Sequence, residues 1–223
     1  MTSTGTGALT EREKNVCVVE NAIGVRSPKT SDLASTLQKM EKTRRSLKKQ
    51  HGADSESDML LLAPCGKYEL VYATGKEVVK RDRSDSSNVK RIARGFYWPS
   101  WLVNAGISFA PDESTNDSKN IKGAVENSAR CGALELRFRG RYEWIPAARK
   151  LSFNFYEMII RLGSMTLMKR ELVDLRTVTS QAEYFDRSEQ IRTLPFFIFF
   201  ESNDSFAAAR GRGGGLALWK RTK

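Results

Sequence analysis

The chain has 223 residues and a mass of 25.1 kDa, which fits one sizeable domain or one domain with an appendage. Its 37 basic and 26 acidic side chains give a formal net charge of +11, which favours a polyanionic partner such as nucleic acid, an anionic membrane surface or an acidic protein. No stretch approaches the roughly 18 apolar residues of a membrane-spanning helix. The cysteines Cys17, Cys65 and Cys131 form no CxxC pair, which excludes a zinc ribbon or thioredoxin-like motif and favours a reducing compartment.

The N-terminal part of the chain is predicted to be helical. Residues 1–10 are rich in Ser, Thr and Gly, so we expect them to be disordered. They lack the apolar core of a secretory signal. From 11 to 62, apolar residues recur at helical spacing on either side of a break at Ser27-Pro28. They are Val16, Val19, Ile23, Leu33, Leu37, Met40 and Leu47. The Gly/Ser/Asp-rich stretch from His51 to Asp58 is typical of a linker.

Beyond residue 63 the apolar period changes from 3.6 to 2, which is typical of strands. Strands are expected at 66–74, 106–110, 121–129, 133–144, 151–155, 165–169, 194–201, 206–210 and 216–220, and a short helix or turn within 89–105. Many short strands separated by turn signals predict a mainly β fold. We expect a lipocalin-like antiparallel β-barrel over 63–223, preceded by the helical segment 11–62. A barrel of about 8–10 strands has no free edges and can hold one small apolar ligand.

The candidate ligand-binding residues are the large apolar side chains that alternate along these strands. Alternation indicates which of them share a face but not which face lies inside the barrel. They either fill the core or border a cavity for an apolar ligand. The set consists of Tyr68, Leu70, Tyr72, Leu136, Phe138, Tyr142, Phe153, Phe155, Phe197, Phe199 and Trp219.

Catalytic and metal chemistry is disfavoured by what the sequence lacks. The single histidine, His51, lies in the predicted linker, a poor scaffold for a nucleophile–base pair. GxSxG, P-loop and HExxH motifs are absent, and the glycines from Gly211 to Gly215 fall between two strands, as in a hairpin turn. We therefore expect no catalytic residues, no metal ligands and no required cofactor.

Basic residues cluster in several places, each open to two interpretations. One cluster lies on the second helical stretch: Lys39, Lys42, Arg44, Arg45, Lys48 and Lys49. Arg137, Arg139 and Arg141, with Arg149 and Lys150, form a strip on a predicted hairpin. Each is either a solvated outer face or a surface for anionic lipid. Lys90, Arg91 and Arg94 beside Phe96, Tyr97 and Trp98 suit single-stranded nucleic acid, although no RRM, KH or zinc-finger signature supports that partner.

Four segments, in this order, resemble the plastid-lipid-associated (fibrillin) family. They are Gly66–Thr74, with its Gly-Lys-Tyr and Leu-Val-Tyr-Ala-Thr elements; Lys122–Asn127; Gly132–Glu143 followed by Arg149–Phe155; and Asp204–Trp219. The resemblance implies a lipocalin-like barrel at the thylakoid membrane or plastoglobule of a plastid. It also implies a non-enzymatic role in binding or supporting a carotenoid, quinone or fatty acid. The alternatives left open are a structural subunit or assembly factor of a thylakoid pigment–protein complex, and single-stranded nucleic-acid binding.

Overall fold

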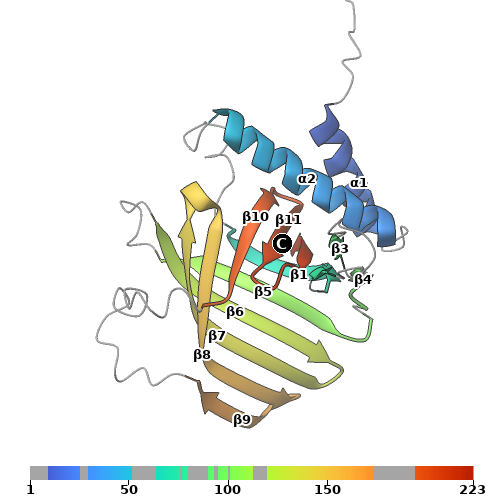
Figure 1. Ribbon diagram of the computed structural model, residues 1–223. Coiled ribbons are helices and arrows are strands. Elements are labelled where there is room, and N and C mark those ends of the chain that lie inside the picture. Colours follow the sequence, from blue (N-terminus) through green and yellow to red (C-terminus); the bar gives the residue numbers. More distant parts are fainter. Residues whose placement is uncertain are drawn as a thin grey trace, which may run out of the picture.

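The computed structural model describes residues 10–25, 30–51, 64–75, 77–79, 90–92, 95–99, 101–112, 120–172 and 194–222. Two N-terminal helices lie across one side of a strongly curved antiparallel sheet (Figure 1). The helices are α1 (Glu11–Val25) and α2 (Thr30–His51). The strands are β1 (Gly66–Thr74), β2 (Glu77–Val79), β3 (Lys90–Ile92), β4 (Gly95–Tyr97), β5 (Asn104–Pro111), β6 (Ile121–Cys131), β7 (Leu134–Ile145), β8 (Lys150–Leu162), β9 (Met165–Glu171), β10 (Phe196–Ser202), β11 (Phe206–Gly211) and β12 (Leu216–Thr222).

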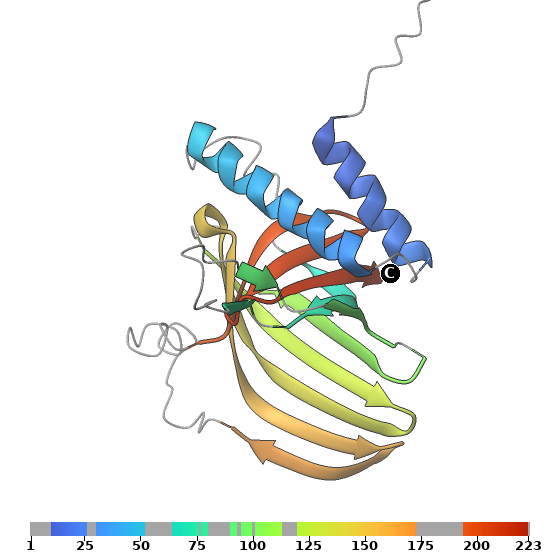
Figure 2. The same ribbon diagram turned by 45° about the vertical axis from the view of Figure 1, so that its right-hand side comes forward.

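The sheet closes into an antiparallel barrel of eight strands in the order β10-β11-β12-β1-β5-β6-β7-β8, with β8 returning to β10. The pairing that closes the barrel is short, because β10 pairs only with the first residues of β8, from Lys150 to Ser152. The far part of β8, from Glu157 to Leu162, pairs instead with β9. Strands β6–β9 therefore extend away from the helices as an open, curved sheet (Figure 2). The prediction of a mainly β, lipocalin-like barrel with an N-terminal helical segment is confirmed.

Two apolar cores lie on opposite faces of this sheet. The first fills the barrel and includes Trp144, Leu151 and Phe199. The second lies between the helices and the outer face of β1, β10, β11 and β12, where Leu33 and Leu37 pack with Phe206. The helical spacing seen in the sequence corresponds to this second core, except that the side chain of Leu47 lies outside the described part of the chain.

An irregularity in β1 places Tyr72 in the second core rather than the first. The register with β12 shifts between Leu70 and Tyr72, so the alternation changes phase there. Tyr68 and Leu70 face the barrel interior, whereas Tyr72 packs beneath the helices, its ring centroid 5.3 Å from that of Tyr97. The prediction that Tyr72 shares the interior face with Tyr68 and Leu70 is wrong, because strict alternation takes no account of a bulge.

Two further local predictions differ from the structure. A short helix or a turn was expected within 89–105; a turn is present, in which the Pro99 carbonyl accepts hydrogen bonds from the Leu102 and Val103 amides, but the short strands β3 and β4 that precede it were not expected. His51 was expected in a linker but is the last residue of α2, and residues 52–58 lie outside the described residues. The predicted glycine turn is confirmed, since the Gly211 amide donates to the Gly215 carbonyl.

Ion pairs that involve the buried carboxylates Glu41 and Glu201 attach the helices to the barrel. From α2, Glu41 accepts hydrogen bonds from Nε and Nη2 of Arg210 on β11, at 2.8 and 2.5 Å, and one from Arg45 at 2.5 Å. From α1, Arg12 donates to Glu201 on β10 at 3.0 Å. Burial alone would raise the pKa of the Glu41 carboxyl, but the hydrogen bonds and charges of Arg210 and Arg45 outweigh it and hold this pKa below its ordinary value.

We predict that Glu41→Gln lowers the free energy of unfolding by about 2–3 kcal/mol at pH 7, because Arg210 is left without its buried counter-charge. Since the pKa of Glu41 is depressed in the folded state, its contribution is present above the ordinary value of 4.5 and is lost as the pH falls below it. Urea unfolding at pH 7 and at progressively lower pH should show the two proteins converging. Arg45→Gln, at an exposed partner, should cost under about 1 kcal/mol; an equal loss in both variants would contradict the argument.

Candidate functional site

The inner face of strands β6–β8 is largely apolar from the closed end of the barrel outwards. Directly paired residues on neighbouring strands lie on the same face of a sheet, so the registers define cross-strand rows. At the closed end these rows are Ile121–Trp144–Leu151, Gly123–Tyr142–Phe153 and Val125–Gly140–Phe155. Burial raises the pKa of the Tyr142 hydroxyl, so this phenol is neutral and the face remains uncharged.

The same face continues past the closure, where β9 joins the sheet. A bulge in β8 at Tyr156 shifts the alternation by one residue, so the inward positions become Met158, Ile160 and Leu162. On β7–β9 the following rows are Phe138–Met158–Arg170, Leu136–Ile160–Met168 and Leu134–Leu162–Met165. On β6 the first of these rows begins with a polar residue, Asn127, opposite Phe138. We call the apolar members of these rows the open face: Leu134, Leu136, Phe138, Met158, Ile160, Leu162, Met165 and Met168. Among the described residues, no strand lies opposite it to complete a barrel.

The open face is partly exposed to solvent, unlike the interior that it continues. Leu134 and Leu162 are about half exposed, and Met165 is 65% exposed. Phe138, Met158 and Ile160, nearer the closure, are half-buried. Adjacent exposed apolar side chains of this kind mark binding surfaces in folded proteins.

A continuous series of aromatic contacts links the open face to the barrel interior. The ring of Phe138 lies 5.5 Å from that of Phe155, which lies 5.3 Å from Phe153. Phe153 stacks on Phe197 at 5.3 Å, and Phe197 meets Trp219 edge-on at 5.1 Å. Beyond them Phe199 contacts both Trp219 and Trp144, at 6.1 and 5.8 Å. Aromatic walls of this kind favour apolar ligands.

The closed part of the barrel is filled by these rings. Trp144 and Phe199 are essentially buried, and the small residues Ala207 and Ala209 on β11 leave room for the large rings of β10 and β12. Gly140 allows a close approach between strands, since a Cβ there would lie 2.0 Å from the Asn154 carbonyl oxygen. A ligand therefore has access to the open face and to the half-buried rings next to it, rather than to the packed interior.

Ten of the eleven predicted ligand-binding residues lie on the inner surface. Tyr68, Leu70, Tyr142, Phe153, Phe155, Phe197, Phe199 and Trp219 belong to or pack against the interior core, while Leu136 and Phe138 lie on the open face. Tyr72 is the exception. The sequence analysis missed Met158, Ile160 and Leu162, because it ended the strand at Phe155. The signal was present in their own alternation, one residue out of phase with Leu151, Phe153 and Phe155.

The predicted basic strip is largely neutralised by carboxylates on the outer side of the same sheet. Arg137 pairs with Glu135 at 2.8 Å and Arg139 with Glu126 at 3.1 Å. Arg141 pairs with Asp112 at 3.2 Å. Hydrogen bonding to Arg137 and nearby arginine charges lower the pKa of the Glu135 carboxyl, despite its burial. Arg149, expected in the strip, is buried. These contacts favour the interpretation of the strip as an ordinary charged outer face.

The other basic clusters are only partly available to a partner. On α2, Lys39 and Lys42 are exposed, but Arg44 is buried, Arg45 pairs with Glu41, and the side chains of Lys48 and Lys49 lie outside the described part. In the segment expected to suit nucleic acid, Tyr97 packs against Tyr72 and is not free to stack on a base. Arg94 and the side chains of Lys90 and Arg91 lie outside the described part.

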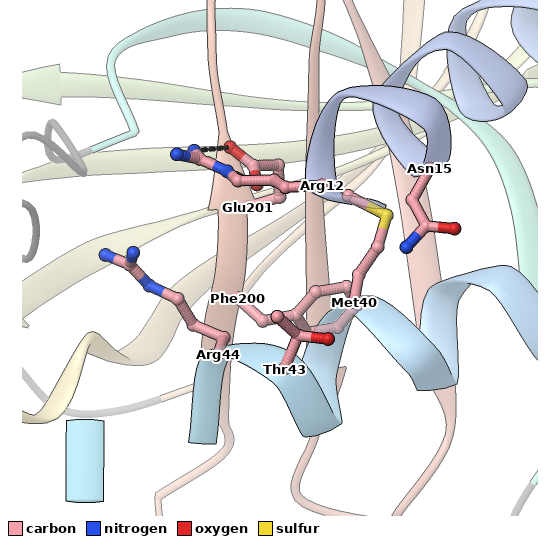
Figure 3. A pocket seen from close by; sticks show the side chains of 7 residues that line it. All are labelled: Arg12, Asn15, Met40, Thr43, Arg44, Phe200 and Glu201. Carbon is pink, nitrogen blue, oxygen red and sulfur yellow. Dashed lines mark hydrogen bonds and ion pairs between the residues drawn. The ribbon is translucent and has the colours of Figure 1, made fainter. Parts of the chain in front are cut away.

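Two hollows elsewhere do not suit an apolar ligand. The first, between α1, α2 and β10, measures about 10 Å³, roughly the room for one water molecule. It is lined by Arg12, Asn15, Met40, Thr43, Arg44, Phe200 and Glu201 (Figure 3). The second is an open depression of about 300 Å³ on β1, β5 and β6, with Lys67, Glu69, Glu126 and Ser128 among its mostly polar lining residues.

No protein-family model, curated protein or solved structure matches this chain. The resemblance to the plastid-lipid-associated family therefore stays a prediction, and the site rests on its geometry. Over the described ranges, the side chains form no cluster of three or more potential metal ligands. None of the described helices is long and apolar enough to cross a membrane.

We predict that alanine substitutions will separate the packed interior from the open face. Phe199→Ala should lower the free energy of unfolding by about 3–5 kcal/mol, because it removes a buried ring that contacts Trp144 and Trp219. Met165→Ala should change it by under about 1 kcal/mol, because that side chain is mostly exposed. Chemical denaturation measures both; a large loss for Met165→Ala would mean that the open face is packed.

Proposed function

We propose that this protein is a non-enzymatic binding protein for a lipophilic molecule, which it holds on the open face and against the adjoining aromatic rings. The observation that carries the proposal is the continuity of one apolar surface from a closed, ring-filled barrel to an exposed sheet. Burying apolar surface against a ligand contributes roughly 25 cal/mol per Å². The half-buried rings of Phe138 and Phe155 also form a wall already shaped before binding, which lowers the entropic cost of binding.

A plastid location and a carotenoid, quinone or fatty-acid ligand belong to this proposal through the sequence resemblance alone. The protein would then act peripherally at a thylakoid membrane or plastoglobule. A structural role at a thylakoid pigment–protein complex would use the same apolar surface with a protein in place of the ligand. Organic extraction of the protein from its native source, followed by mass spectrometry, distinguishes the two, because only the first leaves a lipophile in the extract.

We predict that Phe138→Asp weakens binding of a fluorescent long-chain fatty acid by about tenfold or more, because it places a charge on the apolar wall. Phe138 is better suited than Phe153, whose burial would make an aspartate destabilise the barrel itself. The matched control is Ile198→Asp, which adds the same charge at an exposed apolar residue of β10 outside the inner face. Fluorescence titration measures both; unchanged affinity in Phe138→Asp would contradict the proposed site.

The position of Arg170 indicates where an acidic head group of the ligand would lie. Arg170 shares a row with Phe138 and Met158, and it forms no ion pair or hydrogen bond with any described residue. Lys169, the preceding residue, faces the opposite side and pairs with Glu157 at 2.7 Å. Within the described part of these rows, Arg170 is thus a cation beside the apolar open face with no described counter-charge, which suits a ligand with an acidic head and an apolar tail.

We predict that the protein binds a long-chain fatty acid about three- to tenfold more tightly than the alcohol of the same chain length, because only the acid can pair with Arg170. Arg170→Gln should abolish this preference and leave the alcohol's affinity unchanged. Lys169→Gln, which removes the same charge from the other face, should retain it. Competition with the fluorescent fatty acid measures both ratios; a preference that survives Arg170→Gln would place the acidic head elsewhere.

A further inference from the structure

Three turns at one end of the sheet present apolar side chains to solvent. The turn Gly132-Ala133 joins β6 to β7, and Gly163-Ser164 joins β8 to β9. The two turns are adjacent, because the Gly163 amide donates a hydrogen bond to the Ala133 carbonyl at 2.8 Å. The third turn, at Trp101 and Leu102, leads into β5, whose first residue, Asn104, pairs with Arg130 near the end of β6. All three therefore lie at the same end of the open sheet (Figure 2).

The side chains at this end form what we call the rim: Trp101, Leu102, Leu134, Leu162 and Met165. Trp101 is 86% exposed, more than any other large apolar side chain in the described part of the chain, and the rest of the rim is about half exposed or more. The two hairpin turns themselves are uncharged, and Gly132 and Gly163 adopt positive φ angles that allow them to be tight. Charged side chains begin only behind them.

The charge behind the rim is positive. Arg130 and Arg161 flank the hairpin turns, and both lie near one buried carboxylate, that of Glu135, at 3.8 and 4.0 Å. Glu135 is already hydrogen-bonded to Arg137 at 2.8 Å. One carboxylate therefore faces several guanidinium groups, so a partner with negative charge can compete for Arg130 and Arg161. The rim thus presents apolar side chains, one of them Trp, with basic side chains behind them. Peripheral proteins enter a lipid–water interface with this arrangement of residues.

We propose that the rim docks this protein on an anionic lipid surface, with Trp101, Leu134, Leu162 and Met165 among the acyl chains and Arg130 and Arg161 at the head groups. This surface differs from the one expected on α2, where Arg44 is buried and Arg45 is paired. Leu134, Leu162 and Met165 also belong to the open face, so docking places the lipophile site against the lipid. Docking itself does not require that site to be filled.

Flotation with phosphatidylcholine vesicles containing phosphatidylglycerol tests the proposal with the full chain. The wild-type protein should float with these vesicles, and less with phosphatidylcholine alone. Trp101→Ser should weaken binding about tenfold or more, because it removes the largest inserted side chain. Ile198→Ser, at an exposed apolar residue outside the rim, should float like the wild type. Vesicle binding that is absent from the wild type, or unchanged in Trp101→Ser, overturns the proposal.

Trp101 also supplies a spectroscopic measurement that does not depend on binding strength alone. On adding anionic vesicles, wild-type tryptophan emission should shift to shorter wavelength; Trp101→Phe should still bind but lose most of the shift. If Trp101→Ser instead changes the self-association of the protein in the absence of lipid, the rim is covered by a second copy and the proposal fails. Fatty-acid binding by Trp101→Ser in vesicle-free solution should match the wild type, so that failure of docking is distinguishable from failure of the lipophile site.

Discussion

Strand β8 makes the structure both a barrel and an open sheet, because it changes partners along its length. Its first residues pair with β10 and close the ring, and its later residues pair with β9 outside the ring. Between these segments Tyr156 forms a bulge, and the Leu172 amide donates a hydrogen bond to its carbonyl at 2.7 Å. The bulge keeps the apolar side chains on the inner face while the strand leaves the barrel. Without that phase change, Met158 and Ile160 would face the charged outer side, and the open face would not exist.

The two helices bury the apolar outer face of the strands at the other end of the molecule. Leu33 and Leu37 cover the outer face of the C-terminal strands, and Ala208 leaves room for them to approach closely. The contact between Glu41 and Arg210 adds directional hydrogen bonds to this apolar interface, and such bonds specify position more than they add stability. The helices thereby bury part of the outer surface of the barrel. On the inner surface, the closed part is packed with side chains and the open face is partly exposed.

The sequence was sufficient to predict the fold class and most strands, because alternation at Leu134, Leu136 and Phe138 is strict and the turns carry glycine. It was insufficient where a bulge shifts the phase. Tyr72 was assigned to the wrong core and Ile160 was missed for the same physical reason, since a single extra residue inverts the facing of all that follow. The pairing of the outer arginines with carboxylates could not be predicted from the sequence either, because partners such as Glu126 and Arg139 lie on different strands. The exposure of Trp101 depends on where its turn lies relative to β5, which periodicity does not encode.

Pairing between β1 and β12 has a consequence for how this chain folds. Lys67 lies opposite Thr222, so two strands at opposite ends of the barrel sequence must meet before the ring exists. Contacts of such high sequence separation are slow to form, since a long loop must close first. During synthesis the hairpins of β6–β9 can pair as soon as they emerge, whereas closure must await the synthesis of β12. Before the barrel closes, the nascent chain therefore exposes an apolar and only partly paired sheet to solvent. We expect molecular chaperones to bind the chain at that stage.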